Sequence, residues 1–189
     1  MAAIYSLRPP TTTGLPQAAD FRPPAPAWLK GTWHVTHSTL PMWKSKRNVT
    51  ITYEPLPPSS PSIAQDETDK FESTVAYQTL SSEKVKTVKG TETSSGKDTG
   101  AYDWRGKGWL IIASSHWEVL GYGELEGEQQ WAVTYFAKTL FTPAGIDIYS
   151  RTKEGLPEAA LDGIKTALAA IDHEGIRNLT KDLFVVKRE

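Results

Sequence analysis

Four side chains that can donate or accept a proton lie in segments whose neighbours favour β-strands: His116, Glu118, Asp147 and Tyr149. Asp147 is the most unusual of them, because it lies between Ile146 and Ile148 although strand interiors disfavour aspartate. Histidine and carboxyl groups that are buried together acquire shifted pKa values and can act as general acids and bases. We therefore take these four residues as the candidate catalytic set, with an ordinary hydrogen-bonded pair as the alternative for His116 and Glu118.

Most other chemistries lack their characteristic residues. The chain has no cysteine, so it forms no disulfide and offers no thiol nucleophile. His34 and His37 are three apart and would point to opposite faces of a strand, so we expect no metal site. No phosphate loop, dinucleotide fingerprint or nucleophile elbow is present, and we expect no cofactor.

Charge and hydropathy restrict the partners. The 21 Lys and Arg residues are interspersed with 22 Asp and Glu, giving a net charge of −1, so we expect neither nucleic acid nor a membrane as a partner. The longest apolar stretch, 109–113, is far too short to span a bilayer. Residues 1–6 lack the basic and apolar regions of a secretion signal, so we expect a cytoplasmic protein. The sequence leaves the oligomeric state open.

The 189 residues are enough for one domain with a substantial core. Residues 1–27 contain six prolines and should form an extended, coil-like arm. Residues 28–189 contain short runs rich in β-branched and aromatic residues, separated by turn-forming clusters. These runs predict strands over 32–39, 48–53, 71–79, 85–92, 101–105, 109–114, 117–124, 130–137 and 146–151.

One helix interrupts the strand pattern. Apolar residues spaced three, four and three apart predict an amphipathic helix over about 157–172: Leu161, Ile164, Leu168 and Ile171. Its apolar face should pack outside the strands, against Ile146 and Ile148, and a short strand over 183–186 should return to the sheet. The pattern predicts an all-β protein with a closed antiparallel barrel of eight to ten strands, wide enough to hold one small molecule.

Motifs at the two ends of this strand series resemble those of the lipocalins, a family of the calycin superfamily. Gly31-x-Trp33 is similar to the family's first-strand motif, and Tyr149-Ser150-Arg151-Thr152 is similar to the motif before its helix. Segment 116–186 resembles bacterial lipocalins and apolipoprotein D, whereas segment 53–106 is only weakly similar. The resemblance implies that the Arg151 guanidinium stacks on the Trp33 indole at the closed floor of a ligand-binding barrel.

Side chains alternate along strands, so these motifs predict which residues line the cavity. If Trp33 points inward, Val35 and His37 do so as well, and counting back from Arg151 places Asp147 and Tyr149 inside. Segment 115–122 resembles the family's middle motif, which implies that His116 faces the cavity together with Glu118 and Leu120. Four more ligand-binding residues are expected on other predicted strands: Leu110, Ile112, Thr134 and Phe136.

The loop after the first predicted strand is similar to the family's entrance loop. Met42 and Trp43 are apolar where a solvated loop would be polar. They either close over a bound ligand or pack against the barrel rim.

Two functions fit this lining of apolar and titratable groups. In the first, the barrel encloses a small hydrophobic or aromatic metabolite and acts as a cofactor-independent isomerase, cyclase (including the pericyclic type) or dehydratase. In the second, the protein is a non-catalytic intracellular binder or carrier of such a ligand. Secreted carriers of the family generally have a signal peptide and disulfides, so their absence here favours a biosynthetic role inside the cell.

Overall fold

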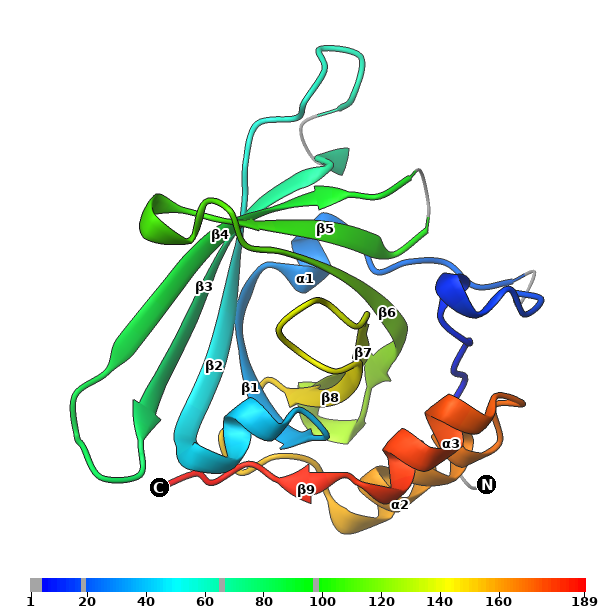
Figure 1. The fold of residues 1–189 in the computed structure, drawn as a ribbon. Helices are drawn as coiled ribbons and strands as arrows, with labels where there is room; N and C mark the ends of the chain where they lie inside the picture. Colours follow the sequence, from blue (N-terminus) through cyan, green and yellow to red (C-terminus); the bar gives the residue numbers. More distant parts are fainter. Residues whose placement is uncertain (1–4, 18–19, 65–66, 97–98) are drawn as a thin grey trace.

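The computed structural model describes residues 5–17, 20–64, 67–96 and 99–189. Eight antiparallel strands form a closed barrel, because each strand pairs with the next and β1 pairs with both β8 and β2 (Figure 1). The strands are β1 Gly31–Ser38, β2 Lys46–Pro55, β3 Lys70–Thr79, β4 Lys86–Ser94, β5 Ala101–Gly106, β6 Ser114–Glu124, β7 Gln130–Phe136 and β8 Gly145–Ser150. The predicted barrel is confirmed, and the predicted terminal strand is the two-residue β9, Phe184–Val185, paired with the end of β1.

The predicted amphipathic helix is α2, Glu158–Ala169, and it lies outside the barrel. Ile164 and Leu168 are fully buried against Ile146 and Ile148 of β8, because the outward face of that strand is apolar. A second helix, α3 Glu174–Lys181, follows it and was not predicted, because its eight residues give little periodicity to detect. No helix within the described ranges is long and apolar enough to cross a bilayer.

The barrel has two distinct ends. We call the end with the β1–β2, β3–β4, β5–β6 and β7–β8 loops the open end; the β3–β4 hairpin reaches the lower left of Figure 1. The opposite, closed end is covered by the short helix α1, Pro26–Leu29, whose Trp28 ring lies 4.9 Å from the ring of Trp33. Loops thus surround the open end, whereas a helix and two tryptophan rings close the opposite end.

The segment predicted as a strand over 109–114 is instead mostly the β5–β6 loop. Arg105 pairs directly with Ser114, and the chain between them forms the 3₁₀ helix η4, Gly108–Leu110, and a turn. Gly108 permits this reversal because its φ of +64° suits glycine. Ile112 consequently does not line the interior, because it is 88% exposed, whereas Leu110 lies in η4 against Gly106 at the end of β5 and not on a strand.

The described part of the proline-rich arm is mostly coil, interrupted by the 3₁₀ helix η1, Thr11–Thr13, and its first part follows the outer wall of the barrel. The backbone N–H of Arg8 donates to the carbonyl of Leu120 at 2.9 Å, and Leu7 packs where a side chain at Gly121 would stand. The arm then reaches α1 at the closed end. It therefore covers β6 from outside as well as leading to the barrel floor.

Candidate functional site

Arg151 and Trp33 close the barrel floor as the motifs predict. The guanidinium carbon lies 3.6 Å from the indole centroid, and Trp33 is fully buried. Arg151 also donates to the Thr32 carbonyl at 3.2 Å and to Gln130 Oε1 at 2.9 Å. Gly31 has a φ of +94°, and a Cβ there would lie 3.4 Å from the Arg151 guanidinium, which explains the glycine of the first-strand motif.

Replacing Arg151 with Ala should lower thermal stability without changing affinity for a molecule held in the barrel. The variant loses a cation–π contact and several hydrogen bonds, together about 2 kcal/mol, which corresponds to a drop of roughly 4–8 °C in melting temperature. Calorimetry checks this, with Arg105→Ala as the control because that arginine is exposed. Unchanged melting with lost binding would show that Arg151 contacts the ligand instead.

Above the floor, a polar cluster surrounds Asp147 on the inner wall. Strand register places Asp147 opposite Ser38 of β1 on one side and opposite Thr134 of β7 on the other. The Ser38 hydroxyl donates to Asp147 Oδ1 at 2.5 Å, and Trp43 Nε1 donates to Oδ2 at 3.3 Å. Burial raises the pKa of Asp147 from 3.8 to about 7, while these two hydrogen bonds oppose the shift. Asp147 can therefore exchange a proton near neutral pH.

Tyr149 lies two residues further along β8 and shares the inward face. Its buried hydroxyl lies close to the hydroxyls of Thr134 and Tyr53, but neither Tyr149 nor Thr134 makes a well-aligned hydrogen bond among the described residues. Burial, and then the charge of nearby Asp147, raise the pKa of Tyr149 well above its ordinary value. The phenol therefore keeps its proton and remains a donor, and no strong hydrogen bond holds it, so it is the type of group that can stabilise a developing oxyanion.

A second interior carboxyl, Glu92 of β4, was missed by sequence reasoning. It is 4% exposed and accepts a hydrogen bond from Trp117 Nε1 at 2.8 Å. Burial raises its pKa from 4.5 to about 7. β4 and β8 are four strands apart around the eight-strand ring, so Glu92 and Asp147 occupy opposite walls. The pairing of Glu92 with inward-facing Phe71 shows that Glu92 points into the barrel. The residue types around Glu92 in the sequence do not indicate this orientation.

Aromatic rings fill much of the space between these walls. Trp117 is stacked between Tyr53 and Tyr102, with centroids 5.6 Å and 4.7 Å away. The Phe136 ring centroid lies 6.3 Å from that of Trp117, and the two rings are inclined by 26°. Flat apolar surfaces thus face the polar cluster.

Comparison with known proteins places this geometry in a known fold. No family model matches the chain. Lobster apocrustacyanin A1 superposes with a TM-score of 0.57 at 13% identity, covering 85% of this chain and 78% of that one. The siderocalin Ex-FABP superposes with a TM-score of 0.54 at 16% identity, covering 85% and 94%. The chain has the lipocalin fold.

One curated relative is similar over nearly the whole length of this lipocalin-fold chain. It is the botcinic acid biosynthesis cluster B protein 12 of Botryotinia fuckeliana (strain B05.10). The two sequences are 26% identical in an alignment of length 188 that covers 96% of this chain and 83% of the relative.

The structure places His116, Glu118 and Leu120 outside the lipocalin barrel, contrary to our prediction. Trp117 and Val119 belong to the inner core instead, whereas Leu120 packs in the cluster beneath α2. A bulge between Val119 and Gly121 then shifts the register of β6 against β7. The predicted phase, taken from the family's middle motif, is therefore wrong by one residue.

Glu118 instead holds the arm against the barrel. Its carboxylate forms a 2.9 Å ion pair with Arg8 and accepts hydrogen bonds from the backbone and hydroxyl of Thr11. Both Arg8 and Glu118 are buried. With its oxygens so occupied, Glu118 fits the structural alternative rather than proton transfer.

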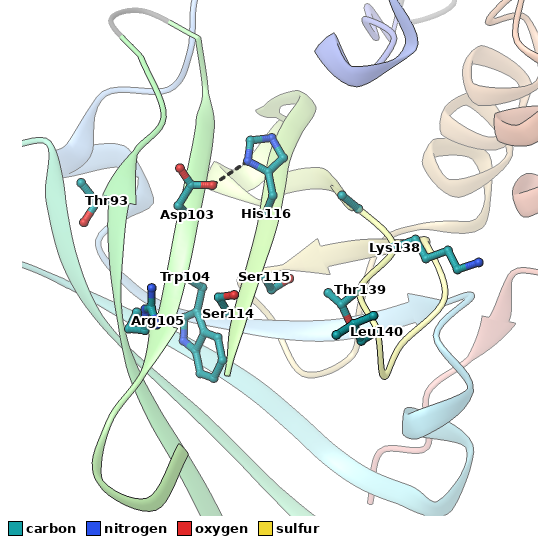
Figure 2. A pocket seen from close by; sticks show the side chains of 11 residues that line it. Thr93, Asp103, Trp104, Arg105, Ser114, Ser115, His116, Lys138, Thr139 and Leu140 are labelled. Atoms are coloured by element: carbon teal, nitrogen blue, oxygen red, sulfur yellow. Dashed lines mark hydrogen bonds and ion pairs between the residues drawn. The ribbon is translucent and has the colours of Figure 1, made fainter. Parts of the chain in front are cut away.

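His116 lies at an open groove outside the barrel wall (Figure 2). Its Nδ1 lies 2.8 Å from Asp103 Oδ1, and its Nε2 lies 3.4 Å from Glu118 Oε1. The groove, about 940 Å³, is bounded by β5, the start of β6 and the β7–β8 loop with Thr139 and Leu140. His116 thus forms the hydrogen-bonded pair named as the alternative and does not reach the polar cluster.

His37 also points away from the interior, contrary to our prediction. A bulge in β1 pairs His37 with outward-facing Ile148 and leaves Ser38 to face Asp147. Burial, followed by nearby Lys165 and Arg188, lowers the pKa of His37 to about 4. The imidazole is therefore neutral near pH 7 and faces the helical side of the barrel.

The remaining predicted lining residues divide between the interior and the rim. Val35 and Phe136 belong to the inner core. Trp43, in the 3₁₀ helix η2 Pro41–Ser45, is 6% exposed and reaches Asp147 from the open end, whereas Met42 is 47% exposed. Trp43 therefore covers the polar cluster at the mouth of the barrel. Within the described ranges, no three His, Asp or Glu side chains gather closely enough to hold a metal ion.

Proposed function

We propose that this chain encloses a small, largely apolar metabolite in its barrel, and that Asp147 and Tyr149 catalyse a cofactor-independent isomerisation or cyclisation of it. The observation that carries the proposal is Asp147 itself. It is fully buried, its pKa is raised to about 7, and beside it lie the buried hydroxyls of Tyr149 and Thr134, which make no well-aligned hydrogen bond among the described residues. Protein interiors rarely keep such groups unsatisfied without a functional reason.

The geometry assigns a separate task to each oxygen of Asp147. Ser38 fixes Oδ1 and so sets the orientation of the carboxyl group. Oδ2 is held only by the longer bond from Trp43, at 3.3 Å, within the described residues. A substrate that displaces Trp43 leaves Oδ2 free to take a proton from carbon or oxygen and return it to another atom.

Tyr149 and Thr134 complete the site by binding the oxygen on which charge develops. When Asp147 removes a proton next to a carbonyl, negative charge moves to the carbonyl oxygen. A buried hydroxyl that makes no well-aligned hydrogen bond can turn to donate to that oxygen at little cost. The stacked rings of Tyr53, Trp117 and Tyr102 would hold the apolar part of the substrate in a folded shape.

The similarity to a protein named for a biosynthesis cluster supports a metabolite as the substrate. It extends over 96% of this chain, so it includes the strands that form the interior site. We infer a role in a biosynthetic pathway for a small organic molecule.

Non-catalytic carriage of the same kind of molecule is the alternative function. The aromatic stack and the covering Trp43 favour retention of a flat or apolar ligand even without proton transfer.

Native mass spectrometry of protein purified from its own source tests the shared part of both functions. We expect a small molecule to be retained in a one-to-one complex, and incubation with a metabolite extract to convert one component of the extract. Binding without conversion would support the carrier. Neither retention nor conversion would overturn the proposed function.

A further inference from the structure

The open end gathers the exposed apolar side chains of the molecule. Seven of the eight large hydrophobic residues that are exposed in the described part of the chain lie on its four loops, and the eighth, Val185, lies in β9 beside them. Ile112, Leu140 and Phe141 are 88%, 95% and 90% exposed. The other four are Met42, Leu80, Val85 and Ile111. Such a concentration around one opening marks a contact surface, because single exposed apolar residues are normally scattered.

The same four loops and the adjoining strand ends are basic. Six cations there form no ion pair with any acidic group in the described ranges: Lys44, Lys46, Lys84, Lys86, Arg105 and Lys138. A seventh, Lys107, is paired with Glu72, and the one acidic loop residue, Glu83, is paired with Arg47. The open end is therefore strongly positive although the whole chain has a net charge of −1.

The closed end has the opposite character. Its β2–β3 and β6–β7 loops contain no Lys or Arg and include Glu67, Asp69 and Glu126. The adjoining cations, Lys30, Lys70 and Arg151, are outnumbered once Glu54, Glu124 and Glu128 are added. Charge is thus sorted along the barrel axis, which orients the molecule in an external field. An anionic surface would attract the open end and repel the closed one.

We propose that the open end is a docking surface for a bilayer that contains anionic lipids. Apolar side chains from separate loop tips can enter the interface between head groups and acyl chains, while flexible lysines around them reach the phosphate and carboxylate groups. Five of the six unpaired cations are lysine, a residue depleted at protein–protein interfaces, where arginine and aromatic anchors prevail. The composition therefore favours lipid over a protein partner.

This surface departs from our expectation that a membrane is not a partner. That expectation rested on net charge averaged over the chain, and averaging hides charges that the fold collects at one end. If the proposed function also holds, docking directs the mouth under Trp43 toward the bilayer, and an apolar substrate can enter from the lipid phase. Only this last consequence rests on the proposed function.

Vesicle flotation of the ligand-free full chain tests the docking surface. We expect the wild-type protein to float with vesicles that contain phosphatidylserine and to remain behind with phosphatidylcholine alone, more so at low salt. Because each lysine near an anionic surface strengthens partition about fivefold, Lys84, Lys86 and Lys138→Gln together should weaken it on the order of a hundredfold. The matched control replaces Lys30, Lys70 and Lys181 with Gln, which changes the net charge equally at positions outside the four loops of the open end.

A second triple variant, Ile112, Leu140 and Phe141→Ser, tests the apolar part and should also lose flotation. These side chains are exposed, so circular dichroism should show an unchanged fold. Equal flotation of the control and of both open-end variants would overturn the proposal, as would absence of wild-type flotation. The proposal would also be overturned if sedimentation showed that the wild type self-associates and that Phe141→Ser abolishes this association. The open end would then be an interface between two copies of this chain. Interior variants such as Tyr149→Phe should float normally, so failure of the proposed function leaves this result unaffected.

Discussion

Replacing Asp147 with Asn is expected to lower turnover by two to four orders of magnitude while substrate affinity changes less than about tenfold. Asparagine has nearly the same shape and can still accept the hydrogen bond that Ser38 donates to Oδ1. It cannot take up a proton, so only the step that needs a base is lost. Single-turnover kinetics with the substrate identified by mass spectrometry separates the chemical rate from the dissociation constant.

Glu118→Gln is the matched control for this prediction. It makes the same chemical change at another fully buried carboxyl, but one that lies outside the barrel and is paired with Arg8. We expect normal turnover together with lower stability, because Arg8 is left without its counter-charge. If Asp147→Asn retained full turnover, Asp147 would not be the base, and a wild-type protein without any turnover would support the carrier.

The inward phase of β8 could be predicted because a motif residue with an unambiguous position, Arg151, lies one residue after the strand. Counting back in twos places Tyr149 and Asp147 inside, where the structure has them. Thr134 and Phe136 on β7 were also placed inside, there because the resemblance aligned Ala132 with an inward position, and β7 pairs with β8 without a bulge. Where a strand is regular and anchored, alternation alone locates its cavity residues.

The prediction of which β6 side chains point inward was wrong because it followed the family resemblance instead of the polar and apolar pattern of the residues. His116, Trp117, Glu118 and Val119 alternate polar and apolar, which by itself predicts Trp117 and Val119 inside. The bulges in β1 and β6 limit sequence-based prediction in another way. An extra residue in a strand changes which of the following side chains point inward, and the composition of the strand does not reveal it. His37 was misplaced and Ser38 missed for that reason.

Glu92 shows a third limit, since its neighbours Thr91 and Thr93 make it look like part of a solvated strand. Its burial depends on pairing with β3 and β5, and these contacts join residues far apart in the sequence. The gathering of six lysines at the open end has the same origin. Each lysine is unremarkable in its own loop, and only closure of the barrel brings the four loops together.

The two interior carboxyls, Asp147 and Glu92, should make the free energy of unfolding of the wild type decrease as the pH rises. Replacing either carboxyl should remove the part of this decrease that it causes. The folded pKa of Asp147 is raised from 3.8 to about 7, and that of Glu92 from 4.5 to about 7. Between those values the folded protein keeps protons that the unfolded chain has released. Stability is therefore greatest below the unfolded pKa, falls through this window, and is constant above it.

The side chain introduced by Asp147→Asn does not titrate. The free energy of unfolding of this variant, minus that of the wild type, should therefore rise by about 4 kcal/mol between pH 4 and pH 8. The corresponding rise for Glu92→Gln should be about 3 kcal/mol. Urea unfolding at a series of pH values measures this difference. His37, whose folded pKa is lowered to about 4, produces the opposite slope below pH 6.5, but it is common to all three proteins and cancels in the comparison. A constant offset between variant and wild type across this range would mean that the carboxyl ionises normally. If Asp147→Asn gains stability at high pH and also loses turnover, the protein keeps a destabilising buried carboxyl at this position because the reaction requires it.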